Sequence, residues 1–369
     1  MSKNSSNIGL EFPDKSLSLN KQSKELLEKI FIRAQTLEER INSKSISYKK
    51  VSESKIAKKR IKEWKEILSC SEIDFKTKRL KWGNLPSLDD LPIGEYESYK
   101  SEQIKFDQWI YTLSEIIELS SRVFDLETSN SFETEDNRNN SNSDSEFAFL
   151  DDINLPFQEV YAPAIILATD RIKNKFSNAR IIFRPQAIIA LQRSLLYNLV
   201  EIGADIFHRK FQLEKLLNNQ KTNKFPLYYL FLDKILNKNG LSLVFAEYPT
   251  FARMLATYVD LWVHDQMNFI HNLTNDIDQL QNYFFANTKL TSIEEIIDGV
   301  SDAHNGRKSV KLIRFNNECR VVYKPRDINL LFTYNKFLAK LKEYNQNLDL
   351  KTLKILSKFE YGWVEFVEH

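Results

Sequence analysis

Glycine is scarce in this chain, with eight residues among 369, and this scarcity restricts the fold more than any other sequence feature. Tight turns between strands depend on glycine, because glycine adopts positive φ without a steric penalty. A chain built mainly of hairpins would need many such turns. The helical spacing of apolar residues also dominates most of the sequence. We therefore expect an α+β protein that is predominantly α-helical.

Helical spacing predicts three helical stretches. Residues 21–69 carry one apolar stripe near their start, and the same spacing resumes over 101–126 and again over 150–284. Between them, residues 127–146 are Ser, Asn, Asp, Glu and Thr with almost no apolar side chain, which is typical of a loop or linker. We accordingly predict an amino-terminal helical region over 1–126, an acidic polar linker over 127–148 and a helical domain over 149–290.

The apolar period changes after Thr291. Residues 309–315 and 320–323 alternate apolar and polar side chains across a short turn at Asn316–Asn317, which indicates a hairpin. Asp327 is placed to cap a helix that runs to about Tyr344. That helix should bury the stripe Leu331, Tyr334, Leu338 and Leu341. Two more strands are predicted over 353–359 and 363–367. This order of strand, strand, helix, strand, strand over residues 291–369 is that of a kinase-like small lobe, from its second strand to the hinge.

A polar loop before this hairpin and a lysine at its end suggest a phosphate site. Asp302, His304, Asn305 and Gly306 precede the first strand, and Lys324 ends the second. In kinases, a loop between strands covers the nucleotide phosphates and a strand lysine contacts them. Each feature alone has a plainer reading, since Asp, Asn and Gly are common in turns and an exposed lysine is common on an edge strand. Their spacing makes the phosphate site the sharper hypothesis.

Several other classes of protein are not supported. Gly299 lies seven residues before Gly306 rather than five, so the Gly-Arg-Lys-Ser segment is not a Walker A loop, and no Gly-x-Gly-x-x-Gly is present. The histidines and the two distant cysteines, Cys70 and Cys319, predict no metal or zinc site and no disulfide. There is no signal-peptide core and no long apolar run. We therefore expect a cytoplasmic protein without a transmembrane segment, and the net charge of +2 argues against a nucleic-acid partner.

Six ordered blocks of sequence carry a resemblance to a known family. They are Arg60-Ile61-Lys62-Glu63-Trp64 with Phe75, Arg79 and Leu80; Leu155-Pro156-Phe157 with Pro163; Glu247-Tyr248-Pro249-Thr250-Phe251-Ala252-Arg253-Met254-Leu255; Asp302-Ala303-His304-Asn305-Gly306; Tyr323-Lys324-Pro325-Arg326; and Tyr361-Gly362-Trp363-Val364-Glu365-Phe366. In these blocks, from about Lys50 onward, the chain resembles the dehydratase region of class II (LanM-type) lanthipeptide synthetases.

The resemblance implies an activity and a set of site residues. Such enzymes use ATP and magnesium to phosphorylate Ser and Thr of a ribosomal precursor peptide, and then eliminate phosphate to give dehydroamino acids. By motif position, Lys324 would contact the ATP phosphates, with Asn305 and Gly306 in the nucleotide-binding loop. Asp302 and His304 would serve phosphorylation or elimination, and the sequence leaves their division of labour open.

The chain departs from the family pattern at two places. Where the family usually has His-Asn-Gly-Gly-Arg-Ser, this chain has Arg307 and Lys308 after Gly306, so one permissive backbone position carries a side chain. The likeness also ends at the expected hinge. We therefore expect the metal-binding large lobe, and a zinc-dependent cyclase domain, to be absent from the sequence, so that the chain alone would not dehydrate peptides. A separately encoded large lobe is one expected partner.

Two readings of function follow. The first is the amino-terminal part of such a dehydratase, from a truncated, split or frameshifted gene; the second is a non-catalytic peptide-binding module that delivers a precursor to a separate enzyme. A basic run over 49–65 includes Lys58, Lys59 and Lys62. It is either a solvated helix face or a contact for an acidic leader peptide.

Overall fold

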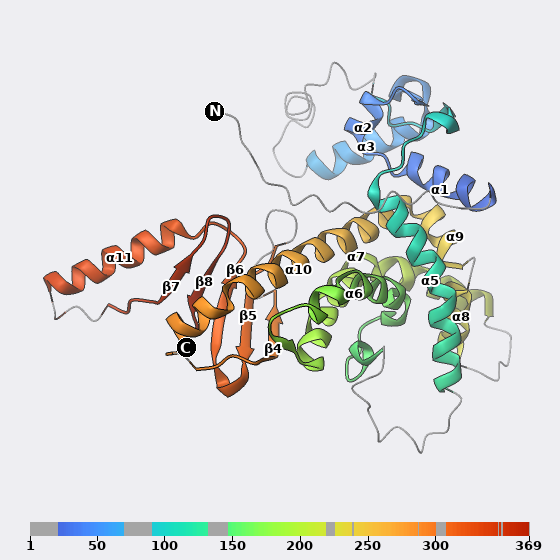
Figure 1. The fold of residues 1–369 in the computed structure, drawn as a ribbon. Helices are drawn as coiled ribbons and strands as arrows, with labels where there is room; N and C mark the ends of the chain where they lie inside the picture. The colour runs from blue at the N-terminus through green and yellow to red at the C-terminus, as the bar shows by residue number, and fades with distance from the viewer. Residues whose placement is uncertain are drawn as a thin grey trace. The chain divides into compact units, whose positions relative to one another are not determined.

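The computed structural model describes residues 21–69, 91–131, 147–218, 226–237, 240–286, 288–299, 308–345, 347 and 350–368. The fold is mixed α and β and predominantly helical, as expected (Figure 1). The chain divides into two compact units, one built from Asp14–Ser114 with Ser242–Met254 and the other mainly from Glu115–Leu241 with Leu255–His369. Among the described residues, no helix combines the length and apolar character needed to cross a membrane.

The first unit contains short helices and a two-stranded sheet. Helix α1 (Lys21–Arg33) and α2 (Leu37–Asn42) precede β1 (Ile46–Tyr48), a 3₁₀ turn (Val51–Glu53) and α3 (Lys55–Ser69). Strand β1 pairs antiparallel with β2 (Tyr96–Tyr99), which precedes a 3₁₀ turn (Ser101–Gln103). The prediction of one helical stretch over 21–69 was therefore wrong in its middle. A capping box between Thr36 and Glu39 starts a separate helix there.

Long helices make up much of the second unit. They include α5 (Gln108–Ser131), whose first residues belong to the first unit, α6 (Ala162–Ser177), α7 (Pro185–Asn218) and α8 (Leu227–Leu236), with 3₁₀ turns at Ala148–Leu150 and Gln158–Tyr161. Helix α9 (Gly240–Glu247) is followed by α10 (Pro249–Phe284), which contributes residues to both units. Of the predicted linker, residues 132–146 lie outside the described part of the chain.

A six-stranded sheet occupies the carboxyl-terminal part of the second unit (Figure 1). Its strands are β3 (Ile182–Phe183), β4 (Ser292–Asp298), β5 (Lys311–Phe315), β6 (Arg320–Lys324), β7 (Ile355–Ser357) and β8 (Gly362–Glu365). Their spatial order is β3-β4-β5-β6-β8-β7. All neighbouring pairs are antiparallel except β3 and β4, which are parallel.

The predicted order of strand, strand, helix, strand, strand is confirmed as secondary structure. Helix α11 (Asn329–Tyr344) lies between the two hairpins, and the Asp327 carboxylate accepts a hydrogen bond from the Asn329 N–H at 2.8 Å. Asn317 and Glu318 in the β5–β6 turn both have positive φ, which asparagine adopts more readily than most residues. The predicted buried stripe of α11 was wrong: no residue of the helix is buried, and Tyr334 is 56% exposed.

The sheet presents two different faces. Tyr323 and Trp363 point toward α10. There the Asn272 side-chain amide donates a hydrogen bond to the Tyr323 hydroxyl, and the Trp363 indole N–H donates one to Asp276. Because successive strand residues alternate between faces, Val322 and Lys324 point the other way. On that face Val322 packs with Ile328, Ile355 and Val364, together with Leu331 and Phe332 around the start of α11. We call these two sides the α10 face and the α11 face.

Candidate functional site

Lys324 lies at the end of β6 on the α11 face. Its side chain is half-buried, and no residue in the described ranges gives its ammonium group an ion pair or a hydrogen bond. Its backbone partner in β8 is Gly362, where an added Cβ would lie 2.2 Å from Ile328 Cδ1. Any side chain at position 362 would therefore collide with Ile328, on the face of the sheet to which Lys324 also points. Burial lowers the pKa of Lys324, and the nearby charge of Arg326 lowers it further.

The loop that carries the other predicted site residues joins β4 to β5. Asp302, His304, Asn305 and Gly306 lie outside the described residues, so their geometry stays a prediction. The two ends of the loop are described. Gly299 leaves β4 with φ of +78°, a conformation that favours glycine. The register of β5 and β6 pairs Lys311 with Tyr323, so the loop returns to the sheet beside Lys324.

A buried ion cluster holds both ends of this loop, on the α10 face. The Lys311 ammonium donates hydrogen bonds to Asp265 Oδ2 at 2.7 Å and to Asp298 Oδ1 at 3.1 Å. The Lys311 side chain is 0% exposed, and those of Asp265 and Asp298 are 5% and 4% exposed. Asp298 ends β4 and Lys311 begins β5, while Asp265 comes from α10. The cluster therefore ties the loop's two ends to one helix.

Hydroxyl and amide groups complete the hydrogen bonds of Asp298. Its Oδ1 accepts bonds from the Ser309 hydroxyl and, at 3.0 Å, from the Gly299 N–H. Its Oδ2 accepts a bond from the Ser194 hydroxyl of α7 at 3.0 Å. A buried carboxylate needs such partners to offset the loss of hydration. Asp298 is thus fully paired, and it contacts both strands that flank the loop.

The three charges in the cluster shift one another's pKa values. Burial raises the pKa of Asp265, and the positive charge of Lys311 offsets this only in part. Burial would also raise the pKa of Asp298, but the charge of Lys311 and the hydrogen bonds from Ser309, Lys311 and Ser194 lower it overall. Burial would lower the pKa of Lys311, yet the two carboxylates raise it. Asp298 is therefore the firmly ionised partner, and Asp265 is the carboxyl that more readily takes a proton.

Sequence reasoning missed this cluster, although a signal was present. In β5, Lys311 occupies the same face as Ile313 and Phe315, both of which are fully buried. A lysine in phase with the buried side of an alternating strand needs a buried counter-charge. On α10, Asp265 and Gln266 similarly fall among buried Trp262, Val263 and Phe269. The pattern indicates that each charge is buried, but only the packing of α10 on the sheet shows which residues pair.

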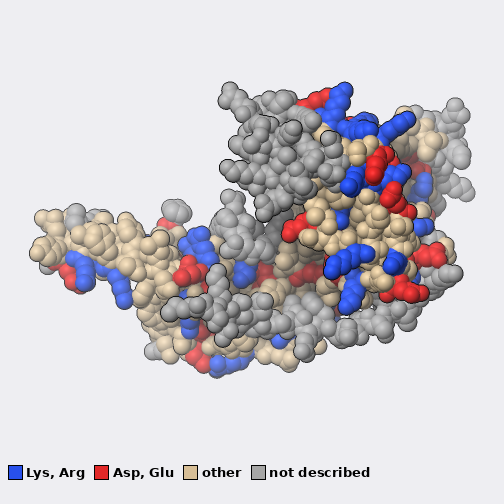
Figure 2. Space-filling model, turned by 90° about the horizontal axis from the view of Figure 1, so that it is seen from above, with Lys and Arg blue, Asp and Glu red and all other residues tan. Residues whose placement is uncertain are grey.

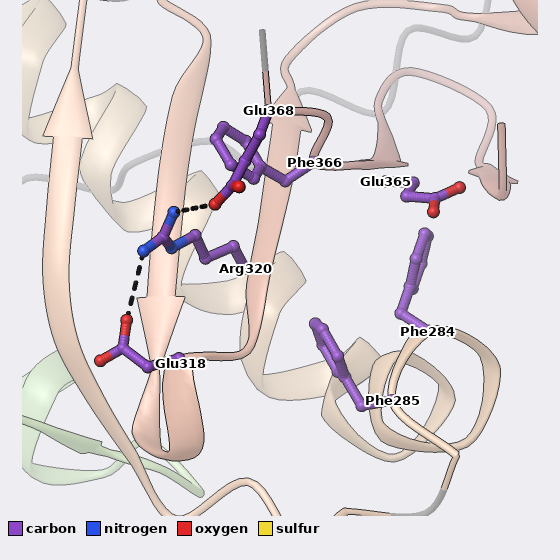
Figure 3. Close-up of a pocket in the computed structure, with 7 residues that line it drawn as sticks. All are labelled: Phe284, Phe285, Glu318, Arg320, Glu365, Phe366 and Glu368. Atoms are coloured by element: carbon purple, nitrogen blue, oxygen red, sulfur yellow. Dashed lines mark hydrogen bonds and ion pairs between the residues drawn. The ribbon is translucent and has the colours of Figure 1, made fainter.

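A second hollow lies at the other end of the sheet, with a volume of about 390 Å³. Figure 3 shows Arg320 at its edge, reaching toward Glu318 and Glu368, while Glu365 and Phe284 lie on the other side. The guanidinium donates to Glu368 Oε1 at 3.0 Å and to Glu318 Oε2 at 3.2 Å. Because two carboxylates already neutralise Arg320, its charge is less available to a phosphate in this hollow than the charge of Lys324 is at the end of β6.

The predicted peptide-binding lysines lie on α3 in the first unit. Lys58, Lys59 and Lys62 are all exposed. Lys59 is 3.7 Å from Glu63, and Lys62 is 3.8 Å from Glu66, each four residues further along the helix. Exposed pairs of this kind contribute little to stability. The helix face is therefore solvated, as the plainer reading expects, and its lysines remain open to an external partner.

The comparison with protein families falls on the part of the chain that holds the sheet. Residues 248–369 match a domain of unknown function, DUF4135. This domain is associated with lanthipeptide synthetase-like proteins. None of the curated proteins compared with the chain matches it. The DUF4135 region contains α10, Lys324, the loop between β4 and β5, and all three charges of the buried cluster.

No metal site is present among the described residues, where no group of three or more His, Cys, Asp or Glu side chains converges. The two carboxylates that do converge, Asp265 and Asp298, already hold the Lys311 ammonium between them. The described part of the chain therefore does not fit the magnesium that the family resemblance implies. Its described residues supply no ligand set for a divalent cation.

Proposed function

We propose that the DUF4135 region of this chain is the phosphate-binding small lobe of a kinase-like dehydratase of the class II lanthipeptide synthetase type. In this proposal, Lys324 contacts the phosphates of ATP. The enzyme phosphorylates Ser and Thr hydroxyls of a ribosomal precursor peptide and then eliminates phosphate. The observation that carries the proposal is Lys324, a half-buried lysine without a counter-charge in the described residues, beside the ends of a loop that spans two neighbouring strands.

The strand arrangement supports a kinase-like small lobe. The strands β4, β5, β6, β8 and β7 are neighbours in that order, with α11 inserted after β6. In protein kinases, a loop between strands covers the nucleotide phosphates and the contacting lysine is on the third strand, before a helix. Here β6 is the third strand counted from β4, and Lys324 is its last residue. This position in the strand order supports the proposed role of Lys324.

The chemistry of Lys324 also suits phosphate. A lysine ammonium is a compact point charge that neutralises phosphate oxygens. An unpaired charge that is half-buried is costly, because it has lost hydration without gaining a partner. An anion from solution would supply that partner. In elimination, Asp302 and His304 are candidates for the base that removes the α-proton and the acid that assists the leaving phosphate, and their assignment remains part of the proposal.

The open surface around α11 is consistent with a further polypeptide on this side. Leu330, Tyr334 and Phe337 are 85%, 56% and 54% exposed. Figure 2 shows the α11 end of the molecule as largely tan, with a few Lys or Arg side chains along it. Exposed apolar patches of this kind mark interaction sites. In our proposal the magnesium ligands come from a large lobe, as a further part of the protein or a separate chain.

An acyl-phosphate derivative of ATP tests the proposed role of Lys324. A lysine at the phosphates attacks the acyl carbonyl, forms an amide and releases ATP. Burial lowers the pKa of Lys324, which increases the fraction of the neutral amine that this attack requires. We expect acylation of Lys324, measured by peptide mass spectrometry, and its loss when excess ATP competes. Lys340, exposed on α11, is the matched control and should be unprotected by ATP.

The reaction itself is tested on a precursor peptide in the presence of a large lobe. Each dehydration lowers the peptide mass by one water. Lys324→Ala should abolish dehydration, while Lys340→Ala should not. Asp302→Asn and His304→Ala then separate their roles, since accumulated phosphopeptide indicates a defect in elimination and unmodified peptide a defect in phosphorylation. Acylation of Lys324 that ATP does not reduce would refute the proposal and favour the non-catalytic peptide-binding module.

A further inference from the structure

A second candidate site lies on the opposite side of the sheet from Lys324. A cavity of about 310 Å³ is bounded by α7, α10 and the end of β4. Its lining includes Tyr197 and Asn198 from α7, and Tyr258, Trp262, Asp265 and Gln266 from α10. Gly299 and Ser309, near the two ends of the loop between β4 and β5, also line it, whereas the side chain of Lys324 points to the α11 face. The inference below concerns a cationic ligand rather than a phosphate, and its test does not depend on the proposed function.

Two residues that line this cavity each have a polar atom that is buried without a hydrogen-bond partner among the described residues. They are Gln266, through its acceptor Oε1, and Trp262, through its donor Nε1, which an ammonium group would not satisfy. Gln266 is 0% exposed, and its amide is oriented by a bond from Nε2 to Asp265 Oδ2 at 3.3 Å. An unmade hydrogen bond of a buried group costs about 1–3 kcal/mol. Native proteins contain few such groups, and a bound water, ion or ligand is one partner that would satisfy them.

The charges around the cavity are also unequal. Asp265 and Asp298 are both buried, and between them they share the single ammonium of Lys311. Both hydrogen bonds that the described residues give Asp265 fall on its Oδ2, which leaves Oδ1 as an acceptor. Lys308 acts on Asp265 through its charge, but the two form no ion pair among the described residues. Among the described residues that line the cavity, Asp265 Oδ1 and Gln266 Oε1 are thus two acceptors without a donor.

The walls of the cavity are aromatic. Tyr258 and Trp262 are one helical turn apart on α10, and Tyr197 of α7 is 51% exposed. Aromatic rings attract an organic cation through their negative faces, and tryptophan does so most strongly. A bare metal ion suits this cavity poorly, because the described residues line it with two carboxylates and Lys311 already bridges them. An alkyl chain with a charged amine matches both the rings and the carboxylate.

We infer that this cavity binds a primary ammonium group on an alkyl chain, with its N–H groups donated to Asp265 Oδ1 and Gln266 Oε1 and its methylene chain against the aromatic walls. Two sources share this chemistry: a free alkylamine, and the side chain of a lysine in a peptide. Pentylammonium represents the first source, and Nα-acetyl-lysine methylamide represents the second. The uncharged isostere, 1-pentanol, tests whether the charge is needed.

Calorimetric titration of the full chain with these three probes tests the inference. We expect pentylammonium to bind at least tenfold more tightly than 1-pentanol. Tighter binding of the lysine amide than of pentylammonium would identify a peptide source, and the reverse a free amine. Asp265→Asn should weaken pentylammonium at least tenfold, and this variant keeps the Lys311–Asp298 pair. Asp170→Asn, which removes an exposed carboxylate from α6, should leave binding unchanged.

A pair of variants at Tyr197 tests the aromatic wall at a half-exposed position, where substitutions disturb the core least. Tyr197→Leu removes an aromatic wall and should weaken pentylammonium several-fold, while Tyr197→Phe keeps the ring and should bind as the unsubstituted chain does. Equal binding of 1-pentanol and pentylammonium would overturn the inference, and so would unchanged binding in Asp265→Asn. Absence of binding by all three probes would also overturn it, and would leave ordered water as the partner of Gln266 and Trp262.

Discussion

Replacing Lys311 by methionine should destabilise the fold far more than replacing any exposed lysine. The substitution shortens the unbranched side chain by one atom and removes its charge, so Asp265 and Asp298 are left buried without a counter-ion. Removing one partner of a buried ion pair costs about 3–5 kcal/mol. Because two carboxylates depend on this one ammonium, we expect a loss near the upper end, about 4–5 kcal/mol. The total free energy of unfolding of a typical domain is about 5–15 kcal/mol.

The pH dependence of this loss distinguishes charge from packing. With Lys311 present, its charge and hydrogen bonds lower the pKa of Asp298, so Asp298 adds stability above its unfolded pKa and loses it as the pH falls. Without Lys311, burial should raise the pKa of both carboxyls in the folded state. Protonation of the folded variant at lower pH then removes the uncompensated charge. The deficit of Lys311→Met should therefore shrink between pH 7 and pH 5.

Urea unfolding followed by circular dichroism at pH 7 and pH 5 measures both effects. Lys340→Met, on the exposed side of α11, is the control and should change the free energy of unfolding by less than about 0.5 kcal/mol. The triple variant Lys311→Met, Asp265→Asn, Asp298→Asn should recover much of the stability, because neutral polar groups replace the unpaired charges. A loss below about 1 kcal/mol, or a deficit that does not change with pH, would refute the assignment of a charge-dependent cluster.

Two further predictions concern the first unit. Glu39 accepts bonds from Arg253 at 2.5 and 2.6 Å, and these bonds lower its pKa to about 2; the stability it contributes should be present above about pH 4.5 and lost as the pH falls toward 2. Since water screens this partly exposed pair, Glu39→Gln should cost about 1 kcal/mol at pH 7 in urea unfolding, and an equal cost at pH 2.5 would contradict the ionic reading. Replacing Lys58, Lys59 and Lys62 by glutamate should weaken the binding of an acidic leader peptide, measured by fluorescence anisotropy. Salt at 1 M should also weaken it, since the Debye length falls from about 10 Å at 0.1 M to about 3 Å. An affinity that neither change alters would show that these lysines only solvate the helix face.

Periodicity in the sequence predicted most of the carboxyl-terminal sheet but missed β4. The hairpin strands, α11 and the last two strands follow regular alternation or helical spacing, and they fold where predicted. Strand β4 has the adjacent pair Glu294 and Glu295, and its register with β5 shifts between Ile293 and Glu295. Such an irregularity breaks the alternation of buried and exposed residues. A strand that contains a bulge therefore escapes a search for a period of two.

The site was predictable only in part, for a similar reason. Lys324 follows a regular strand and carries a local motif, so its place at the end of β6 could be read from the sequence. The cluster of Asp265, Asp298 and Lys311 joins positions 46 and 13 residues apart. Neither the strand pattern around Lys311 nor the helix pattern around Asp265 indicates that these two residues pair. Tertiary packing decides this, because α10 must lie along the sheet before Asp265 can reach Lys311.

The positions of Lys311 and Lys324 indicate that the two lysines have different roles at this edge of the sheet. They lie on neighbouring strands, beside the ends of the same loop, and point to opposite faces. Lys311 is fully buried and fully paired, so its charge holds Asp298 and the two ends of the loop in place. Lys324 is half-buried without a described partner, so its charge is available to a ligand. The proposed phosphate site would need both, because a free charge is useful only where the backbone around it is fixed.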